Sequence, residues 1–198
     1  MKPAYEAVAT TFKAESDCIV ANVDGDDKKN SDLAKRYDVT GFPTIKFFSK
    51  DNKEPVVYES DRTEEAFVAF LNEKCGTQRA VGGGLNDQAG RLPEFDSLAS
   101  KFFVAGAEAR DSIFKEASVL AASVGATSKH YVRVMEKVVN DSETYVQKEA
   151  SRLAKILAKR NLSPSKLDEI KIKANILSAF AEEKVEEPET ISRAEAEL

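Results

Sequence analysis

The stretch Tyr37-Asp-Val-Thr-Gly-Phe-Pro-Thr-Ile-Lys-Phe-Phe48 decides how the first half of the chain is organised. It predicts a helix end, a break at Gly41, a proline turn and then a strand of β-branched and aromatic residues over 44–48. Because Phe42 precedes Pro43, its backbone is driven out of the helical region into an extended conformation. In a tight turn, an X-Pro bond adopts the cis form at a cost of only about 0.5–1 kcal/mol. We therefore expect a sharp bend that leads directly into a strand.

Short elements surround this bend. In chain order they are a helix over 3–13, a buried parallel strand over 18–23, a helix over 32–37, a strand over 56–58 that pairs with 44–48, and a helix carrying Phe67, Phe70 and Leu71. Asp61 or Thr63 can cap the last helix, and Gly76 is suited to end it. The order of helices and strands predicts an α/β domain.

Four pieces of this half carry a family resemblance. They are Gly41-Phe-Pro-Thr44, Lys2-Pro-Ala-Tyr-Glu6, Ile19-Val-Ala-Asn-Val-Asp24, and Tyr58-Glu-Ser-Asp-Arg62, in which Ser60 replaces a family glycine. In this order and spacing they resemble a thioredoxin domain of the protein disulfide-isomerase family, entered partway through. The resemblance implies that two further strands and the redox Cys-x-x-Cys precede Met1. It also implies that the strand over 18–23 has lost both neighbours, so we expect a three-stranded remnant of the sheet.

The resemblance also assigns roles to four residues. Phe42, Pro43 and Thr44 would form the cis-proline loop, in which the backbone of Phe42 meets a substrate peptide. Arg62 matches the family arginine that adjusts the pKa of the resolving cysteine. Because this chain has no such cysteine, we interpret Arg62 as a surface charge on the last helix of this half. The partial thioredoxin-like domain is expected to cover residues 1–78.

Residues 79–91, with Gly82–Gly84 at their centre, predict a flexible linker. A phosphate-binding loop is disfavoured, because no Lys-Ser/Thr follows the glycines. From 92 to 181 the sequence shows only helical periodicity, in five amphipathic segments. Asn72-Glu-Lys-Cys-Gly-Thr77, Ser128-Lys-His-Tyr131 and Ser163-Pro-Ser-Lys-Leu-Asp-Glu169 resemble the helical D domain of endoplasmic-reticulum disulfide-isomerases. The expected fold is therefore a thioredoxin-like α/β fragment followed by an all-α five-helix domain.

Residues 182–198 are Glu-rich and have no apolar period, which predicts a disordered acidic tail. The chain ends Glu-Ala-Glu-Leu198, which shares its last two residues with a Lys-Asp-Glu-Leu retention signal. Residues 1–7 contain no apolar segment, so no signal peptide is predicted. The resemblance implies the endoplasmic-reticulum lumen as the compartment.

Composition excludes several classes of function. The chain has 198 residues, 42% hydrophobic and 32% charged, and a net charge of -5, which argues against a nucleic-acid partner. No apolar run is long enough for a membrane span, and no Cys/His cluster has metal-ligand spacing, so neither a metal nor a cofactor is expected. Cys18 and Cys75 are interpreted as two separate buried structural cysteines. His130 is interpreted as a surface or interhelical residue rather than a catalyst.

Three functions remain open. The first is disulfide isomerisation in the folding of secretory proteins, which the resemblance implies for a parent protein that contains the Cys-x-x-Cys. The second is a redox-silent chaperone that binds unfolded polypeptide through the cis-proline loop and the helical domain. The third is a scaffold that dimerises or docks other folding factors. Without a paired low-pKa thiol, this chain itself is not expected to catalyse thiol-disulfide exchange.

Overall fold

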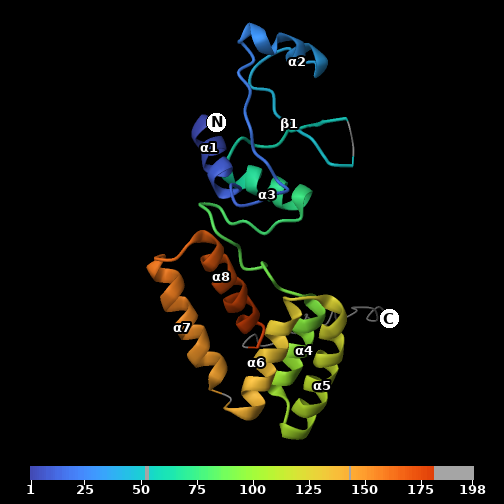
Figure 1. Cartoon of the computed structure of the whole chain (residues 1–198), viewed down its shortest axis with the longest axis vertical. Helices are drawn as coiled ribbons and strands as arrows, with labels where there is room; N and C mark the ends of the chain where they lie inside the picture. The colour runs from blue at the N-terminus through green and yellow to red at the C-terminus, as the bar shows by residue number, and fades with distance from the viewer. Residues whose placement is uncertain (52–53, 143, 181–198) are drawn as a thin grey trace, which may run out of the picture. The chain divides into compact units, whose positions relative to one another are not determined.

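The computed structural model describes residues 1–51, 54–142 and 144–180 (Figure 1). The chain forms two compact units: the first comprises Met1–Ala89 with Lys159–Ile172, and the second comprises Gly90–Ala158 with the chain from Lys173 onward. The expected acidic tail and its terminal Glu-Ala-Glu-Leu lie outside the described residues.

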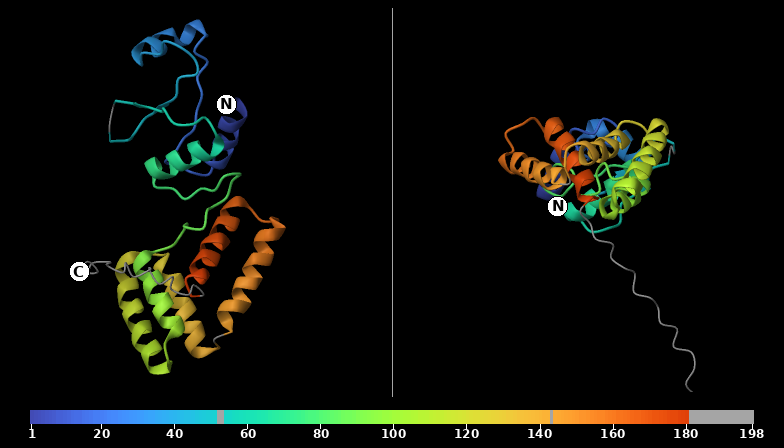
Figure 2. Two further views of the ribbon diagram at one scale, coloured as in Figure 1. Left: turned by 180° about the vertical axis from the view of Figure 1, so that it is seen from behind. Right: turned by 90° about the horizontal axis from the view of Figure 1, so that it is seen from below.

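The first unit is built on two helices that pack against each other. Its elements are α1 (Lys2–Thr11), a 3-10 turn η1 (Lys28–Asn30), α2 (Ser31–Arg36), β1 (Lys46–Phe47), β2 (Val56–Val57) and α3 (Glu64–Cys75). Helices α1 and α3 lie side by side in both ribbon views (Figures 1 and 2). Between them they bury Val8, Phe12 and Phe67 in one apolar cluster. Burial of side chains of this size contributes about 1.5–3 kcal/mol each, so this contact holds the unit together.

Helix α3 has the end signals that the sequence predicts. The Thr63 side chain accepts a hydrogen bond from the backbone N–H of Ala66, which satisfies one of the free donors of the first turn. At the other end Gly76 has φ 66°, in the left-handed region that glycine adopts without a Cβ penalty. Both residues therefore fix the length of α3.

The sheet is smaller than expected. Strands β1 and β2 pair antiparallel, with Lys46 opposite Val57 and Phe47 opposite Val56, which confirms the predicted hairpin. Residues 18–23 do not form a strand, so the expected three-stranded remnant is wrong for the described residues. A strand exists only where a neighbour completes its hydrogen-bond ladder. Cys18 is buried and Val20 is half-buried, but Ile19 is 83% exposed and residues 21–23 are exposed as well, so the segment is not buried as predicted either.

The second unit confirms the predicted helical domain. Its five helices are α4 (Pro93–Val104), α5 (Ala107–Val124), α6 (Ser128–Asn140), α7 (Tyr145–Lys159) and α8 (Pro164–Ser178), of which α8 contributes its residues from Lys173 onward to this unit. The core is a set of fully buried large side chains: Phe95, Phe102, Tyr131, Met135, Ile176 and Phe180. The fold class, a thioredoxin-like portion followed by an all-α domain, therefore stands.

The segment between α3 and α4 contains a hydrogen-bonded turn. Arg79 and Leu85 form an antiparallel bridge, and the N–H of Ala80 donates to the carbonyl of Gly84. Gly82, Gly83 and Gly84 all have positive φ, which explains why three glycines occur together here. The glycine run that predicted a flexible linker thus forms a tight turn.

Candidate functional site

The cis-proline loop combines a fixed bend with an exposed aromatic ring. The peptide bond between Phe42 and Pro43 is cis, as the resemblance implies. The Thr44 hydroxyl donates to the Gly41 carbonyl at 2.6 Å, closing the loop on itself. The Phe42 side chain is 61% exposed. Phe42, Pro43 and Thr44 therefore lie together on the surface of the first unit.

Gly25 provides the space for the Phe42 ring. A Cβ atom built on Gly25 would lie only 2.2 Å from Phe42 Cε1. Any larger residue at position 25 would displace the ring. In the sequence, Gly25 indicates only a break after an apolar run, and this packing role could not be predicted from it.

A groove opens beside the loop. Its volume is about 780 Å³, and three parts of the first unit line it: α1 with α2, the extended segment at 21–26, and the chain at 42–48. Several of its apolar side chains are at least one-third exposed to solvent: Val23, Leu33, Phe42 and Phe48. A cavity of this size with apolar walls falls within the range of roughly 300–1,000 Å³ of ligand-binding sites. The groove can therefore accept apolar side chains of a bound molecule.

Arg62 is exposed and lies in the loop before α3, not on the helix as interpreted from the sequence. Its Nη2 atom lies 3.5 Å from the carbonyl oxygen of Pro43, at the limit of a hydrogen bond. The structure thus brings Arg62 to the cis-proline loop.

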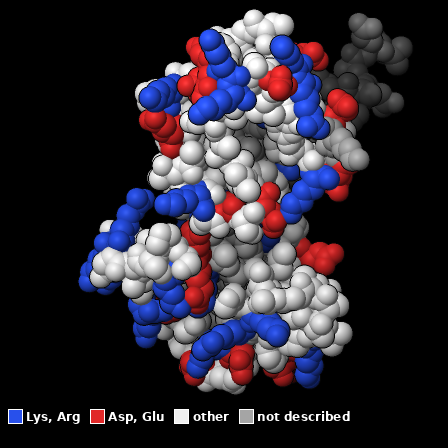
Figure 3. All heavy atoms as spheres, turned by 45° about the horizontal axis from the view of Figure 1, so that its top comes forward, with Lys and Arg blue, Asp and Glu red and all other residues white. Residues whose placement is uncertain are grey.

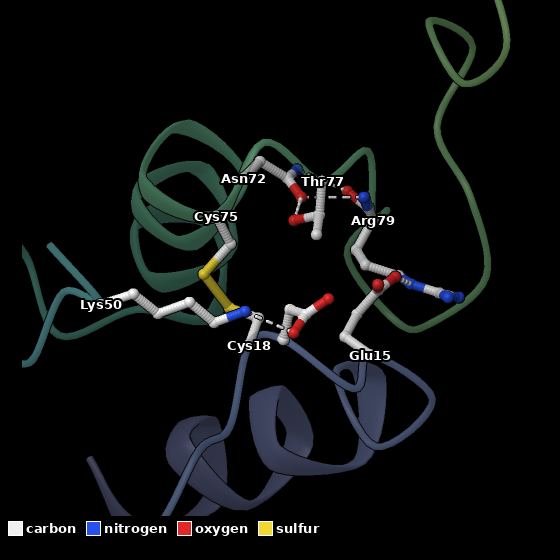
Figure 4. The surroundings of a disulfide bond; sticks show 8 residues. Glu15, Cys18, Lys50, Asn72, Cys75, Thr77 and Arg79 are labelled. Atoms are coloured by element: carbon white, nitrogen blue, oxygen red, sulfur yellow. Dashed lines mark hydrogen bonds and ion pairs between the residues drawn. A yellow bond between two sulfur atoms is a disulfide. The ribbon is translucent and has the colours of Figure 1, made fainter.

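Cys18 and Cys75 form a disulfide, which corrects their interpretation as two separate cysteines (Figure 4). Their Cα atoms are 5.9 Å apart, within the usual range for a bridge. Cys18 follows the loop after α1 and Cys75 ends α3, so the packing of α1 on α3 brings them together. Fifty-seven positions separate them in sequence, and no local pattern indicates the pairing.

A polar cluster lies beside the disulfide (Figure 4). The Asn72 side-chain oxygen accepts from the N–H of Arg79 at 2.8 Å and from the Thr77 hydroxyl at 2.9 Å. The Arg79 guanidinium is buried and pairs with Glu15 and with Asp168 of the same unit. Burial by itself would lower the pKa of Arg79, but the hydrogen bonds that it donates to the two carboxylates outweigh this and raise it. These contacts fix the chain after α3 and are structural.

Among the described residues no group of His, Cys, Asp and Glu side chains is arranged to hold a metal ion. His130 is half-buried beside Arg133, Tyr145 and Glu149 in a small cleft of the second unit, an interhelical position. No described helix is both long and apolar enough to span a membrane. On the surface drawn in Figure 3, side chains of both charges are interspersed around uncharged areas.

Comparison with known proteins agrees with this architecture. The family model for thioredoxin matches residues 1–73, and the model for the C-terminal domain of endoplasmic reticulum protein ERp29 matches residues 90–180. A probable protein disulfide-isomerase A6 from Medicago sativa is 41% identical over 91% of this chain and 50% of its own length. Protein disulfide-isomerase tigA from Aspergillus niger is 39% identical over 94% of this chain and 50% of its own length. Protein disulfide-isomerase 1 from Dictyostelium discoideum is 34% identical over 91% of this chain and 50% of its own length.

The chain therefore spans about half the length of the curated relatives it matches. In each of them the match runs through both units of this chain. The fold, the cis-proline loop and the two family models agree: the chain has a thioredoxin portion followed by an ERp29-type helical domain, and over both it is similar to protein disulfide-isomerases.

Proposed function

We propose that this chain binds unfolded or partly folded secretory proteins in the lumen of the endoplasmic reticulum and so assists their folding. The exposed Phe42 ring beside the 780 Å³ groove carries this proposal. An aromatic ring held in water beside an apolar groove gains free energy when it contacts apolar side chains, which unfolded proteins expose. The family names of the relatives support a role in folding, and the name of the helical family model supports the compartment.

The binding site is proposed to consist of Phe42, Pro43 and Thr44, with the helical domain as a second contact for clients or for other folding factors. The proposed role of Arg62 is to adjust the pKa of a resolving cysteine wherever one is supplied beside the loop. Its approach to the Pro43 carbonyl, at 3.5 Å, is consistent with such a position.

Thiol-disulfide exchange is the activity that the relatives' names describe. Exchange needs a thiolate and a nearby resolving thiol. In this chain both cysteines are joined in one disulfide, and Cys18 is only 4% exposed. We therefore assign to this chain the binding part of the family's function rather than the redox step.

Suppression of client aggregation tests the proposal. Light scattering of a reduced, aggregating client should fall when the chain is present, and Phe42→Ala should lose most of this effect. Val56→Ala is the matched control, because Val56 is also exposed on the first unit but does not line the groove. Equal suppression by Phe42→Ala and wild type would contradict the site. No suppression by the wild type would instead favour a docking module.

Insulin reduction separates binding from redox chemistry. With glutathione or dithiothreitol as electron donor, the chain should give no turnover above background. Turnover that Cys18→Ser abolishes would show that the Cys18–Cys75 pair exchanges with substrates and would contradict the assignment.

A further inference from the structure

Two asparagines of this chain are followed, two positions later, by serine, with no proline between them. They are Asn140, in Asn140-Asp-Ser142, and Asn161, in Asn161-Leu-Ser163. The pattern Asn-x-Ser is the target of N-linked glycosylation, provided that it lies on the surface of a protein that enters the secretory pathway. The two tripeptides stand on either side of α7, one at the end of α6 and the other before α8. Their surroundings in the structure differ.

Asn140 is exposed and its side-chain amide is available. It is the last residue of α6, and Asp141 and Ser142 after it are exposed as well. Within the described part of the chain, the Asn140 side chain has no hydrogen-bond partner. By contrast, the side-chain amides of Asn30 and Asn72 each donate to a backbone carbonyl, at 2.7 and 2.8 Å. The nitrogen that would receive a sugar is therefore unoccupied at Asn140.

The surface beside Asn140 also has room for a sugar. Asn140 lines a hollow of about 640 Å³ that is formed by residues of α5 and α6. On the α5 side, the small side chains of Ser118 and Ala122 leave this space open. On the α6 side, Glu136 and Lys137 supply an acceptor and donors for the hydroxyl groups of a sugar. A polar ring attached to Asn140 would thus meet space and polar groups rather than a packed apolar surface.

Asn161 is exposed too, but its tripeptide is part of the start of α8. The Ser163 carbonyl accepts hydrogen bonds from the N–H groups of Lys166 and Leu167, so Ser163 opens that helix. Pro164 follows directly, and its ring restricts the backbone of Ser163 to the extended region. A glycosyltransferase has to bend the tripeptide into its own site, and a serine with a restricted backbone opposes this. Asn161 therefore has the pattern without the conformational freedom.

We propose that Asn140 receives an N-linked oligosaccharide in the lumen of the endoplasmic reticulum. The proposal rests on the proposed function for the compartment, but it does not depend on client binding. In the transfer, the side-chain nitrogen of Asn140 forms a bond to C1 of the first sugar of a lipid-linked oligosaccharide, and the bond from C1 to the lipid diphosphate breaks. The amide loses one proton, and the diphosphate leaves with the electron pair of the broken bond. No oxidant or reductant is needed.

Asp141 should limit the efficiency of this transfer. In the folded chain its carboxylate pairs with the Lys137 ammonium group at 3.1 Å. Transfer takes place while the chain enters the lumen, before α6 has formed, so this pairing is then absent. The carboxylate lies next to a reaction that expels a diphosphate, and like charges repel each other. We expect only part of the chains to be modified, and Asp141→Ala should raise the modified fraction about twofold. An unchanged fraction would contradict this charge effect.

Import into microsomes tests the proposal. The full chain, with a cleavable signal peptide placed before Met1, is translated in the presence of microsomes from the endoplasmic reticulum. Resistance to added protease identifies the imported chains independently of any modification. A fraction of these chains should migrate more slowly on a denaturing gel, and a glycosidase that removes N-linked oligosaccharides should reverse the shift. Asn140→Gln and Ser142→Ala should each abolish the shift, because each destroys the Asn-x-Ser pattern at this position.

Asn161→Gln is the matched control, because it removes the other Asn-x-Ser tripeptide and should leave the shift unchanged. Imported chains without a shift, or a shift that Asn140→Gln leaves in place, would overturn the assignment. Neither result bears on client binding, which the aggregation measurement with Phe42→Ala tests separately. If the wild type is modified at Asn140 but fails to suppress aggregation, the proposed function falls and the glycosylation site stands.

Discussion

Cys18 and Cys75 close a covalent loop between the end of α3 and the segment that follows α1. Cross-linking residues that are 57 positions apart removes conformational freedom from the unfolded chain, which in the chain-entropy model stabilises the fold by about 4 kcal/mol. The effect is confined to the first unit, because both cysteines belong to it. The short two-stranded sheet adds little to the stability of that unit. The disulfide is therefore a main source of stability for the thioredoxin portion.

Removal of the disulfide should destabilise the first unit. We expect Cys18→Ser with Cys75→Ser to lower its free energy of unfolding by about 2–4 kcal/mol, measured by urea denaturation with fluorescence of labels placed in that unit. Reduction of the wild type should produce the same loss, whereas the double variant should not respond to reductant. A wild type whose melt is insensitive to reductant would argue against the bridge.

Tyr131 connects α4 to α6 in the second unit. Its hydroxyl donates to the Asp96 carboxylate and accepts from the N–H of Leu92 at 3.1 Å. Burial, reinforced by the hydrogen bond to Asp96, raises the pKa of Tyr131 above its ordinary value of 10.0. The native state therefore holds the neutral phenol more strongly than the unfolded state does.

This raised pKa predicts a loss of stability in alkali. Below about pH 10 the phenol is neutral in both states, and its contribution is fully present. As the pH rises above that value, the unfolded chain loses the proton first and unfolding becomes easier. Tyr131→Phe should be less stable at pH 7 by about 1–3 kcal/mol, because the Leu92 N–H and the Asp96 carboxylate each lose a partner. It should also show a shallower decline above pH 10 in urea melts followed by circular dichroism, and an unchanged slope would contradict this prediction.

At the scale of elements, helices and strands differ in how much they depend on their surroundings. A helix makes its own backbone hydrogen bonds, so its residues need only one apolar face and suitable ends. Residues 107–124 accordingly form one of the helices that the periodicity predicts, α5 (Ala107–Val124). A strand needs a neighbour, and residues 18–23 have none among the described residues. The apolar run predicted a buried strand, and that prediction was wrong because the run could not supply its partner.

In the candidate site, too, the local feature could be predicted from the sequence and the contacts between distant segments could not. The Gly-Phe-Pro-Thr sequence was sufficient to predict the bend at Phe42, because the restriction before proline is local. The groove, the contact of Gly25 with the Phe42 ring and the Cys18–Cys75 bridge depend on segments that are distant in sequence. No spacing rule brings such segments together. These features therefore became visible only in the folded chain.

Hydrogen exchange should reveal this difference between elements. In the free chain, the amides of residues 19–23 have no backbone acceptors in the described structure and should exchange close to the rate of an unfolded chain. The amides of Val134, Met135 and Val138 lie in the buried part of α6 and should exchange more slowly by several orders of magnitude. Equal protection of the two groups would mean that the segment already has a strand partner.

At the scale of the whole molecule, two cores of different kinds lie in one chain. The first unit has a small apolar cluster supported by a disulfide, and the second has large, fully buried side chains on every helix except α5. On α5, Ala117 and Ala121 are buried instead. The second core involves no cysteine. A core made of helix faces alone does not need the first unit to complete it.

We therefore expect the helical part to fold by itself, with domain boundaries near residues 92 and 181 as proposed from the sequence. A recombinant piece covering 87–181 should melt cooperatively with the circular dichroism of helix alone. This piece lacks Arg79, so Asp168 loses its ion-pair partner and becomes solvated. The resulting loss of stability is small compared with the free energy that burial of Phe95, Phe102 and Phe180 contributes. The matched variant Phe102→Ala should lower the stability of the piece by about 3–5 kcal/mol, as for a fully buried phenylalanine. A gradual melt, or one that Phe102→Ala leaves unchanged, would show that the helical core forms only with the rest of the chain.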